Sequence, residues 1–312
     1  APAGREVELR LSTLPTAFGE KLVMRIFDPE VLVRDLRSLG FSEEDQTRWK
    51  QMTKSPNGII LVTGPTGSGK TTTLYTTLKQ LATPEVNVCT IEDPIEMVEQ
   101  SFNQMQVQHS INIGFVDGIR ALMRQDPDIV MIGEIRDLET AEMAIQAALT
   151  GHLVLSTLHT NDAPSAITRL LDLGVPAYLI NSTLLGVMAQ RLVRTLCPHC
   201  KTPYPTREEQ RSTWRSLVAP WKSGEPAQMY EPVGCLECRM TGYSGRVGIY
   251  EILVNSPEIR KLIKPLTDIP KVREQAYREG MRPLRISGAL KVAQGTTSLE
   301  EVIKVAPPAD EG

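Results

Sequence analysis

The sequence predicts an α/β protein whose core is a parallel β-sheet covered by helices on both faces. Between about residues 59 and 173, short apolar runs typical of buried strands alternate with longer helical segments. Such alternation requires helical crossovers between parallel strands. The 312 residues are 41% apolar and 23% charged, as in ordinary globular proteins. A formal net charge of −3 argues against a dedicated nucleic-acid binder, and no apolar run reaches the roughly 18–20 residues of a membrane helix.

The chain is expected to begin with a β-hairpin. Glu6–Leu11 alternates polar and apolar residues, Pro15 and Gly19 mark a turn, and Lys21–Phe27 is a second apolar run. Because two strands alone are marginally stable, the hairpin should belong to a larger sheet. Residue 1 is not methionine, so we expect the rest of that sheet to lie upstream in a longer protein.

A helical pattern follows the hairpin. We expect helices at Val31–Leu39 and Glu43–Met52, with Gly40 ending the first and Ser42 capping the second. The next elements are expected to be, in order, the strand Ile59–Thr63, the helix Thr71–Leu81, the strand Val86–Ile91, the helix Asp117–Gln125, the strand Ile129–Ile132, the helix Glu139–Leu149, the strand Leu153–Thr157, the helix Ala163–Leu173 and a long helix Ala177–Leu196. Residues 197–248 show little periodicity, whereas residues 256–305 are mainly helical, with Thr297 or Ser298 as the last N-cap.

A phosphate-binding loop is expected at residues 64–71. This segment matches G-x-x-x-x-G-K-[ST] in full and lies between an expected strand and an expected helix, as the motif requires. Glycines let successive backbone N–H groups surround an anion, and the helix N-terminus adds partial positive charge. Lys70 can reach the β- and γ-phosphates, and Thr71 can offer its hydroxyl to Mg²⁺. The residues expected to bind ATP are Gly64, Pro65, Thr66, Gly67, Ser68, Gly69, Lys70, Thr71 and Thr72.

Two acidic segments follow expected strands and are candidates for holding Mg²⁺ and activating water. One is Glu92–Glu96, and the other is Glu134, which follows the apolar run Ile129–Ile132. Gly133 occupies the position where a Walker-B aspartate is usual, so Glu134 must serve Mg²⁺, the water, or both. The alternative for any single glutamate is a solvated surface charge.

Basic side chains near these segments are further candidates. His159 ends an expected strand and could contact a γ-phosphate, although a lone histidine is as readily structural. Arg136 follows Glu134 closely, and Arg120 and Arg124 share one helical face. For these arginines, ordinary ion pairing is the alternative.

Four of the five cysteines form two C-x₂-C pairs. Cys197 and Cys200 are followed by Cys235 and Cys238, and four thiolates suit a closed tetrahedral Zn²⁺ site. His199 is then surplus as a ligand, and Cys89, in an expected strand, is expected to be a small buried hydrophobe.

Taken together, these segments resemble the ATPases of type II secretion and type IV pilus assembly (GspE-like and PilB-like proteins). GPTGSGKTTT (64–73) looks like their Walker A, TIEDPIE (90–96) like their Asp box, RQDPDIVMIGEIRD (124–137) like their atypical Walker B, and TGHLVLSTLHTND (150–162) like their His box. The tetracysteine insertion is similar to that of the extension and secretion branch. GALKVAQGTTSLEEVIKV (288–305) leans toward the type II secretion type.

The resemblance implies a homohexameric, Mg²⁺-dependent, RecA-like P-loop ATPase that needs ATP, Mg²⁺ and Zn²⁺. It implies that Glu134, Glu96, Lys70 and His159 act in catalysis, with either glutamate activating water, and that Arg10 and Arg25 reach the nucleotide. It also implies a cytoplasmic motor peripherally associated with the bacterial inner membrane. Its partners would be platform and assembly proteins, bound mostly through a missing N-terminal region, and no nucleic acid is expected.

The resemblance divides the chain into four parts. These are the remnant of an N-terminal α/β domain with a linker (1–30), the RecA-like core (31–196), the tetracysteine zinc module (197–248) and a C-terminal helical region (249–312). The expected function is to power type II secretion by pseudopilus assembly. A type IV or mannose-sensitive-haemagglutinin-type pilus extension ATPase is the near alternative. A RecA-class nucleic-acid motor and a non-hydrolysing nucleotide-binding scaffold are remote ones.

Overall fold

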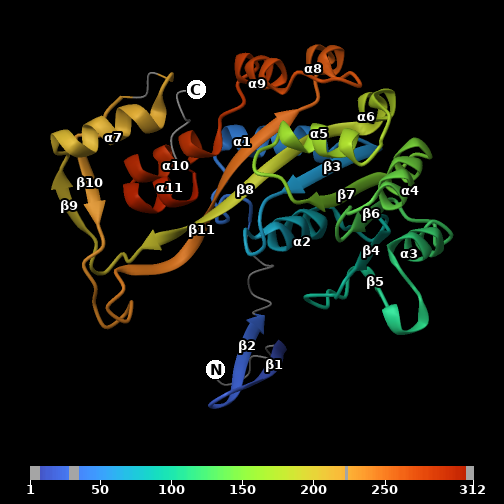
Figure 1. Cartoon of the computed structure of the whole chain (residues 1–312), viewed down its shortest axis with the longest axis horizontal. Helices are drawn as coiled ribbons and strands as arrows, with labels where there is room; N and C mark the ends of the chain where they lie inside the picture. Colours follow the sequence, from blue (N-terminus) through green and yellow to red (C-terminus); the bar gives the residue numbers. More distant parts are fainter. Residues whose placement is uncertain (1–7, 28–34, 222–223, 307–312) are drawn as a thin grey trace.

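The computed structural model describes residues 8–27, 35–221 and 224–306. Its centre is a seven-stranded, mostly parallel sheet, which confirms the predicted α/β class (Figure 1). In spatial order, the strands are β11 (Tyr243–Val254), β8 (Leu184–Leu196), β3 (Gly58–Thr63), β7 (Leu153–Leu158), β6 (Ile129–Ile132), β4 (Val88–Glu92) and β5 (Asn103–Gln106). Only the β8–β11 pair is antiparallel.

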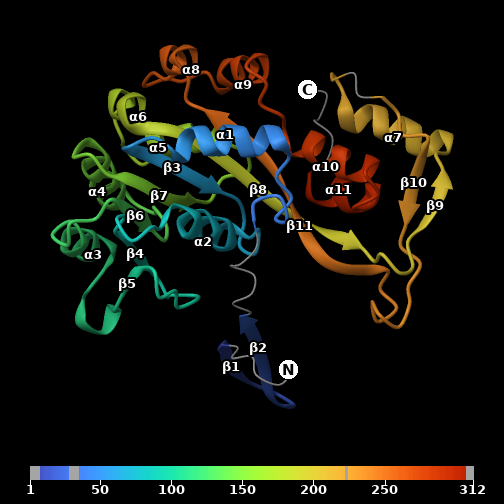
Figure 2. The same ribbon diagram turned by 180° about the vertical axis from the view of Figure 1, so that it is seen from behind.

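Helices cover both faces of this sheet, because its strands bury side chains on both sides. In β3, Ile60 and Val62 pack with residues of α1 (Glu43–Thr53) and α2 (Lys70–Leu81). Ile59 and Leu61 of the same strand join the core of the opposite face. That face carries α3 (Phe115–Leu122), α4 (Leu138–Leu149), α5 (Ser165–Asp172) and α6 (Ala177–Thr183). Figure 2 shows α1 crossing in front of the sheet.

The C-terminal part packs beside β8 and β11. Its helices are α7 (Glu208–Val218), α8 (Pro257–Leu262), α9 (Ile269–Arg278), α10 (Leu284–Ala293) and α11 (Leu299–Val305), and α7 is accompanied by the small ribbon of β9 (Thr202–Pro205) and β10 (Gln228–Glu231). The Ser298 hydroxyl accepts the Glu301 N–H, so Ser298 is the N-cap of α11, one of the two residues predicted for that role. No helix of the described ranges combines the length and apolar character needed to span a membrane.

The predicted N-terminal hairpin forms, from β1 (Glu8–Thr16) and β2 (Gly19–Phe27), but its turn is tighter than predicted, because Pro15 and Gly19 are paired strand residues; Glu6 lies outside the described residues. It stands apart from the main sheet in both views (Figures 1 and 2). Its exposed apolar side chains are Leu9, Leu11, Leu14, Phe18, Leu22, Val23 and Met24. An apolar two-stranded ribbon of this kind is consistent with the expectation that it belongs to a larger unit.

Two helix predictions are wrong. The segment Ala177–Leu196 is not one long helix, because α6 ends at Thr183 and β8 then runs for 13 residues between β3 and β11. Close packing of this strand requires Gly186, where an added Cβ would lie 2.4 Å from the Leu253 carbonyl oxygen. The described part of the expected helix Val31–Leu39 is a turn from Leu36 onward, and residues 31–34 lie outside the described residues.

Candidate active site and metal centre

The predicted phosphate loop connects β3 to α2 and has the backbone conformation that anion binding needs. Gly64, Gly67 and Gly69 have φ of 151°, 78° and 87°, values that favour glycine. A Cβ at Gly64 would lie 2.5 Å from the Gln190 carbonyl oxygen, so the loop also requires glycine for close packing. The exposed tip at Thr66 and Gly67 leaves room for a ligand in front of the N-terminus of α2.

Lys70 occupies the first position of α2 and folds back over this loop. Its Nζ donates to the carbonyl oxygens of Gly64 at 2.8 Å and Pro65 at 3.1 Å. Burial lowers the pKa of Lys70, and the nearby carboxylates of Glu134 and Glu96 oppose this shift. The structure therefore brings together the predicted lysine and both predicted glutamates.

Gln190 is a positioning residue that the sequence analysis missed. It is buried on β8, where its Nε2 donates to the Ser68 carbonyl oxygen at 2.8 Å and its Oε1 accepts from the Thr73 hydroxyl at 2.9 Å. The strand register explains this contact: β3 ends with Thr63 opposite Ala189, so the next residue of β8 lies directly behind the loop. A glutamine inside a segment interpreted as a helix offered no signal for this role.

The predicted acidic segment after β4 divides into a buried and a half-buried glutamate. Glu92 is 4% exposed and accepts from Tyr75 Oη at 2.6 Å and from Thr90 Oγ1 at 2.7 Å. Burial raises its pKa, although these donors oppose the shift. Glu92 thus ties α2 to this strand, while Glu96 is half-buried and close enough to influence Lys70.

Glu134 follows β6, as predicted, and its carboxylate contacts an arginine and a histidine side chain. It pairs with Arg136 and with His159, whose Nε2 lies 3.5 Å from Glu134 Oε2. Gly133 allows the close approach of β4, because a Cβ there would lie 3.3 Å from the Ile91 carbonyl oxygen and 3.5 Å from Glu92 Cα. A larger side chain at that position would therefore require a small shift of its neighbours.

The other predicted arginines do not join this cluster through described contacts. Arg120 forms ion pairs with Asp117 at 3.9 Å and Glu139 at 3.8 Å. Within the described residues, neither Arg120 nor Arg124 has a hydrogen bond or ion pair with the phosphate loop. Arg10 and Arg25 are directly paired across the β1–β2 hairpin, and their side chains lie outside what the structure describes.

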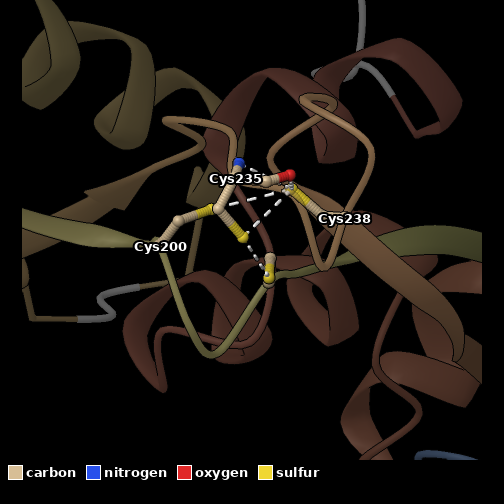
Figure 3. A group of neighbouring side chains, drawn as sticks. Cys200, Cys235 and Cys238 are labelled. Atoms are coloured by element: carbon tan, nitrogen blue, oxygen red, sulfur yellow. Dashed lines mark hydrogen bonds between the residues drawn. The ribbon is translucent and has the colours of Figure 1, made fainter.

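The four predicted cysteines converge at the far end of the β8–β11 pair. Figure 3 shows the side chains of Cys200, Cys235 and Cys238 directed toward one another. The Sγ atoms of Cys197 and Cys235 are 3.8 Å apart, as are those of Cys200 and Cys238, and all four sulfurs lie within 4.8 Å. A Zn–S bond of about 2.3 Å places the corners of a tetrahedron about 3.8 Å apart. These separations therefore fit a zinc site and are too long for disulfides.

Backbone N–H groups prepare the sulfurs for this role. Gly234 donates to Cys200 Sγ at 3.3 Å, and both Cys235 and Gly242 donate to Cys238 Sγ at 3.2 Å. Burial alone would raise the pKa of Cys238, but the amide donors prevail and lower it to about 6. The amide donors thus favour the thiolate, which is the form that binds zinc, at Cys238, whereas burial raises the pKa of Cys200 to about 11.

Comparisons with known proteins agree with this geometry. The family model described as "Type II/IV secretion system protein" matches residues 2–304. The chain is 62% identical over 306 residues to the type IV pilus assembly ATPase TfpB of Acinetobacter baylyi, covering 98% of this chain and 52% of that protein. It is 49% identical over 306 residues to the type II secretion system ATPase E of Vibrio cholerae, covering 97% and 59%. The chain thus spans a little over half the length of these relatives.

Solved structures show the same fold. The pilus retraction motor PilT with bound ADP aligns with a TM-score of 0.69 at 28% identity, covering 97% of this chain and 75% of that one. The Legionella pneumophila ATPase DotB aligns with a TM-score of 0.68 at 23% identity, covering 98% and 74%.

Proposed function

Because the chain belongs to the type II/IV secretion system protein family, we propose that it is the Mg²⁺-dependent ATPase of a pilus-assembly or secretion machine. The observation that carries this proposal is the placement of Lys70, at the start of α2 and folded over the phosphate loop, within electrostatic range of the carboxylates of Glu134 and Glu96. A phosphate-binding loop that faces two acidic groups has the parts that phosphoryl transfer to water requires. The relatives are themselves named as secretion and pilus ATPases.

In this proposal, the loop amides and Lys70 hold the phosphates of ATP. Lys70 would exchange its hydrogen bonds to the Gly64 and Pro65 carbonyls for bonds to the β- and γ-phosphates. Thr71 and Glu134 would hold Mg²⁺, which neutralises charge on the phosphates when it is bound. Thr71 is half-buried near the start of α2, a position suited to this task.

We propose that Glu134 or Glu96 orients the attacking water. Glu134 is held by Arg136 and His159, so its carboxylate has a defined orientation. Through this contact, His159 would report the state of the γ-phosphate to the loop that follows β7. Arg10 and Arg25, adjacent in the hairpin, would approach the nucleotide from outside the core and stabilise transition-state charge.

The larger assembly is also part of the proposal. Residues 31–196 would act as the RecA-like motor core and 197–248 as a structural zinc module, with β11 (Tyr243–Val254) crossing the boundary after residue 248 and completing the sheet of the core. Residues 1–30 and 249–312 would be the end of an N-terminal domain and a helical region. A homohexamer peripherally attached to an inner-membrane platform would convert hydrolysis into fibre assembly. We place pilus assembly ahead of type II secretion because identity is 62% with the named pilus relative and 49% with the named secretion relative.

The test is Mg-ATP hydrolysis by the parent chain and two lysine variants. Lys70→Ala should lower kcat by about 10²-fold or more, because it removes a charge aimed at the transition state. Lys79→Ala is the matched control: Lys79 lies on the same helix and pairs with Glu99 at the surface. It should stay within about twofold of the parent, since surface pairs contribute little. Parent-level hydrolysis by Lys70→Ala would refute the proposal, and strong stimulation by DNA would favour a nucleic-acid motor instead.

A further inference from the structure

The loop between β7 and α5 is held by side chains from elements far away in the sequence. It carries His159 and continues through Asp162. The Thr160 N–H donates to Thr63 Oγ1 at 2.7 Å, and Arg191 donates to the Asn161 carbonyl oxygen at 2.8 Å. The first contact comes from β3 and the second from β8, so the loop is fastened to the strands behind it.

Two further contacts to the same loop come from later in the chain, one from a C-terminal helix and one from the central sheet. Arg273, on α9, pairs with the Asp162 carboxylate at 2.9 Å. Glu251, on β11, accepts the Ala163 N–H at 2.8 Å. Through this bond, the Glu251 carboxyl group of β11 holds the end of the loop that carries His159.

Burying the carboxyl group of Glu251 costs more desolvation free energy than a purely structural contact requires. Its side chain is buried, and desolvation raises its pKa to about 7. The charged and titratable groups that face it are Asp162, Arg191, Arg273, Tyr277 and Arg285. A carboxyl group kept in such a place, with Oε1 accepting the Ala163 N–H, indicates a requirement for exact loop position.

We propose that Glu251 and Arg273 are positioning residues that hold the loop 159–163 so that His159 stays beside Glu134. The proposal rests on the ATPase function proposed above and extends it to the C-terminal part. His159 lies four residues before Ala163, so a shift of that anchor would move the histidine relative to the Glu134 carboxylate. Small displacements of catalytic groups are costly, and 1 Å can change a rate by about 10²-fold.

The experiment is a double-mutant cycle on ATP hydrolysis. Glu251→Ala should lower kcat by about tenfold or more and change KM less than about twofold. In the His159→Ala background, the same change should cost less than about twofold, because the group being positioned is already absent. Equal factors in the two backgrounds, or an unchanged kcat in His159→Ala, would overturn the proposal.

Conservative variants keep the test valid if Glu251→Ala folds poorly. Glu251→Gln retains an oxygen that can accept the Ala163 N–H, so its kcat should stay within about threefold of the parent. Arg273 is partly exposed, and Arg273→Lys should retain activity that Arg273→Ala loses, since a lysine can still pair with Asp162. Equal activity of the lysine and alanine variants would contradict a role for this pair.

Glu301→Gln is the matched control. Glu301 is also buried and paired with an arginine, but its partner is Arg194, and its contacts lie away from the loop. It should leave kcat within about twofold, and a loss equal to that of Glu251→Ala would show a general packing effect instead. Lys70→Ala, measured in parallel, separates failure of this inference from failure of the ATPase assignment.

Discussion

The contact between Gln190 and the phosphate loop can be tested with one substitution made at two positions of α2. Thr73 and Thr76 are both about 1% exposed and lie one turn apart. The Thr73 hydroxyl donates to Gln190 Oε1 at 2.9 Å, whereas the buried Thr76 hydroxyl has no hydrogen-bond partner. Valine has the same shape and nearly the same helix propensity as threonine, so each replacement changes only the hydroxyl.

The expected effects have opposite signs. Thr73→Val leaves Gln190 Oε1 buried without its donor, which should cost about 1–3 kcal/mol of the free energy of unfolding. Thr76→Val replaces an unpartnered hydroxyl with a methyl group, so it should be neutral or stabilising by up to about 1 kcal/mol. Urea unfolding followed by circular dichroism measures both values.

Nucleotide affinity gives a second, independent measurement. Gln190 holds the Ser68 carbonyl with its other amide atom, so loss of the Thr73 contact should also loosen the loop. Binding of a fluorescent ATP analogue should weaken in Thr73→Val and stay unchanged in Thr76→Val. If the two variants are equally stable and bind nucleotide equally well, Gln190 does not hold the loop as described.

Two further predictions concern ionisation and metal. Burial raises the pKa of Glu251 to about 7 from 4.5, so the folded protein retains a proton there that the unfolded chain releases. Its free energy of unfolding should therefore fall as pH rises from about 4.5 to 7. Measured by urea unfolding, Glu251→Gln should become more stable relative to the parent by up to about 3 kcal/mol across that pH range. A difference between the two proteins that does not change with pH would contradict the raised pKa. Elemental analysis of freshly reduced protein should find about one zinc per chain. Most of this zinc should be lost in Cys235→Ser and retained in the control Cys89→Ser, because Cys89 lies in β4 away from the cluster. Metal-free parent protein would exclude the site.

Local sequence patterns were sufficient for most of the parallel sheet. The strand Ile129–Ile132 was predicted with its exact bounds, because four consecutive apolar residues between a proline turn and a glycine have few alternatives. Ser42 was identified as an N-cap because its side chain can accept the Asp45 N–H, and the structure contains that bond. The phosphate loop and the cysteine cluster were found because the spacing of their residues is itself the chemical requirement.

The errors arise where long-range pairing decides the structure. The run 184–196 is mostly apolar, with Gln190, Arg191 and Arg194 as its main polar residues, and periodicity alone cannot separate a largely buried strand from a largely buried helix. Its partner β11 was not predicted as a strand, so the antiparallel pairing was also missed. Gln190 and Glu251 lie on this pair and gain their roles only from the register that places them behind the nucleotide loops.

The β8–β11 pair connects the two candidate sites of the molecule. Beyond the end of β3, β8 places Gln190 against the phosphate loop and Arg191 against the loop that carries His159. On the neighbouring strand, Glu251 is paired with Ala189 and holds the end of that second loop. The same two strands continue to Leu196 and Tyr243, where the cysteine cluster begins and the Cys197 N–H donates to the Gly242 carbonyl oxygen at 2.9 Å. Because hydrogen-bonded strands resist sliding past one another, a metal bound at the cysteine cluster would also stabilise the register on which both of these loops depend.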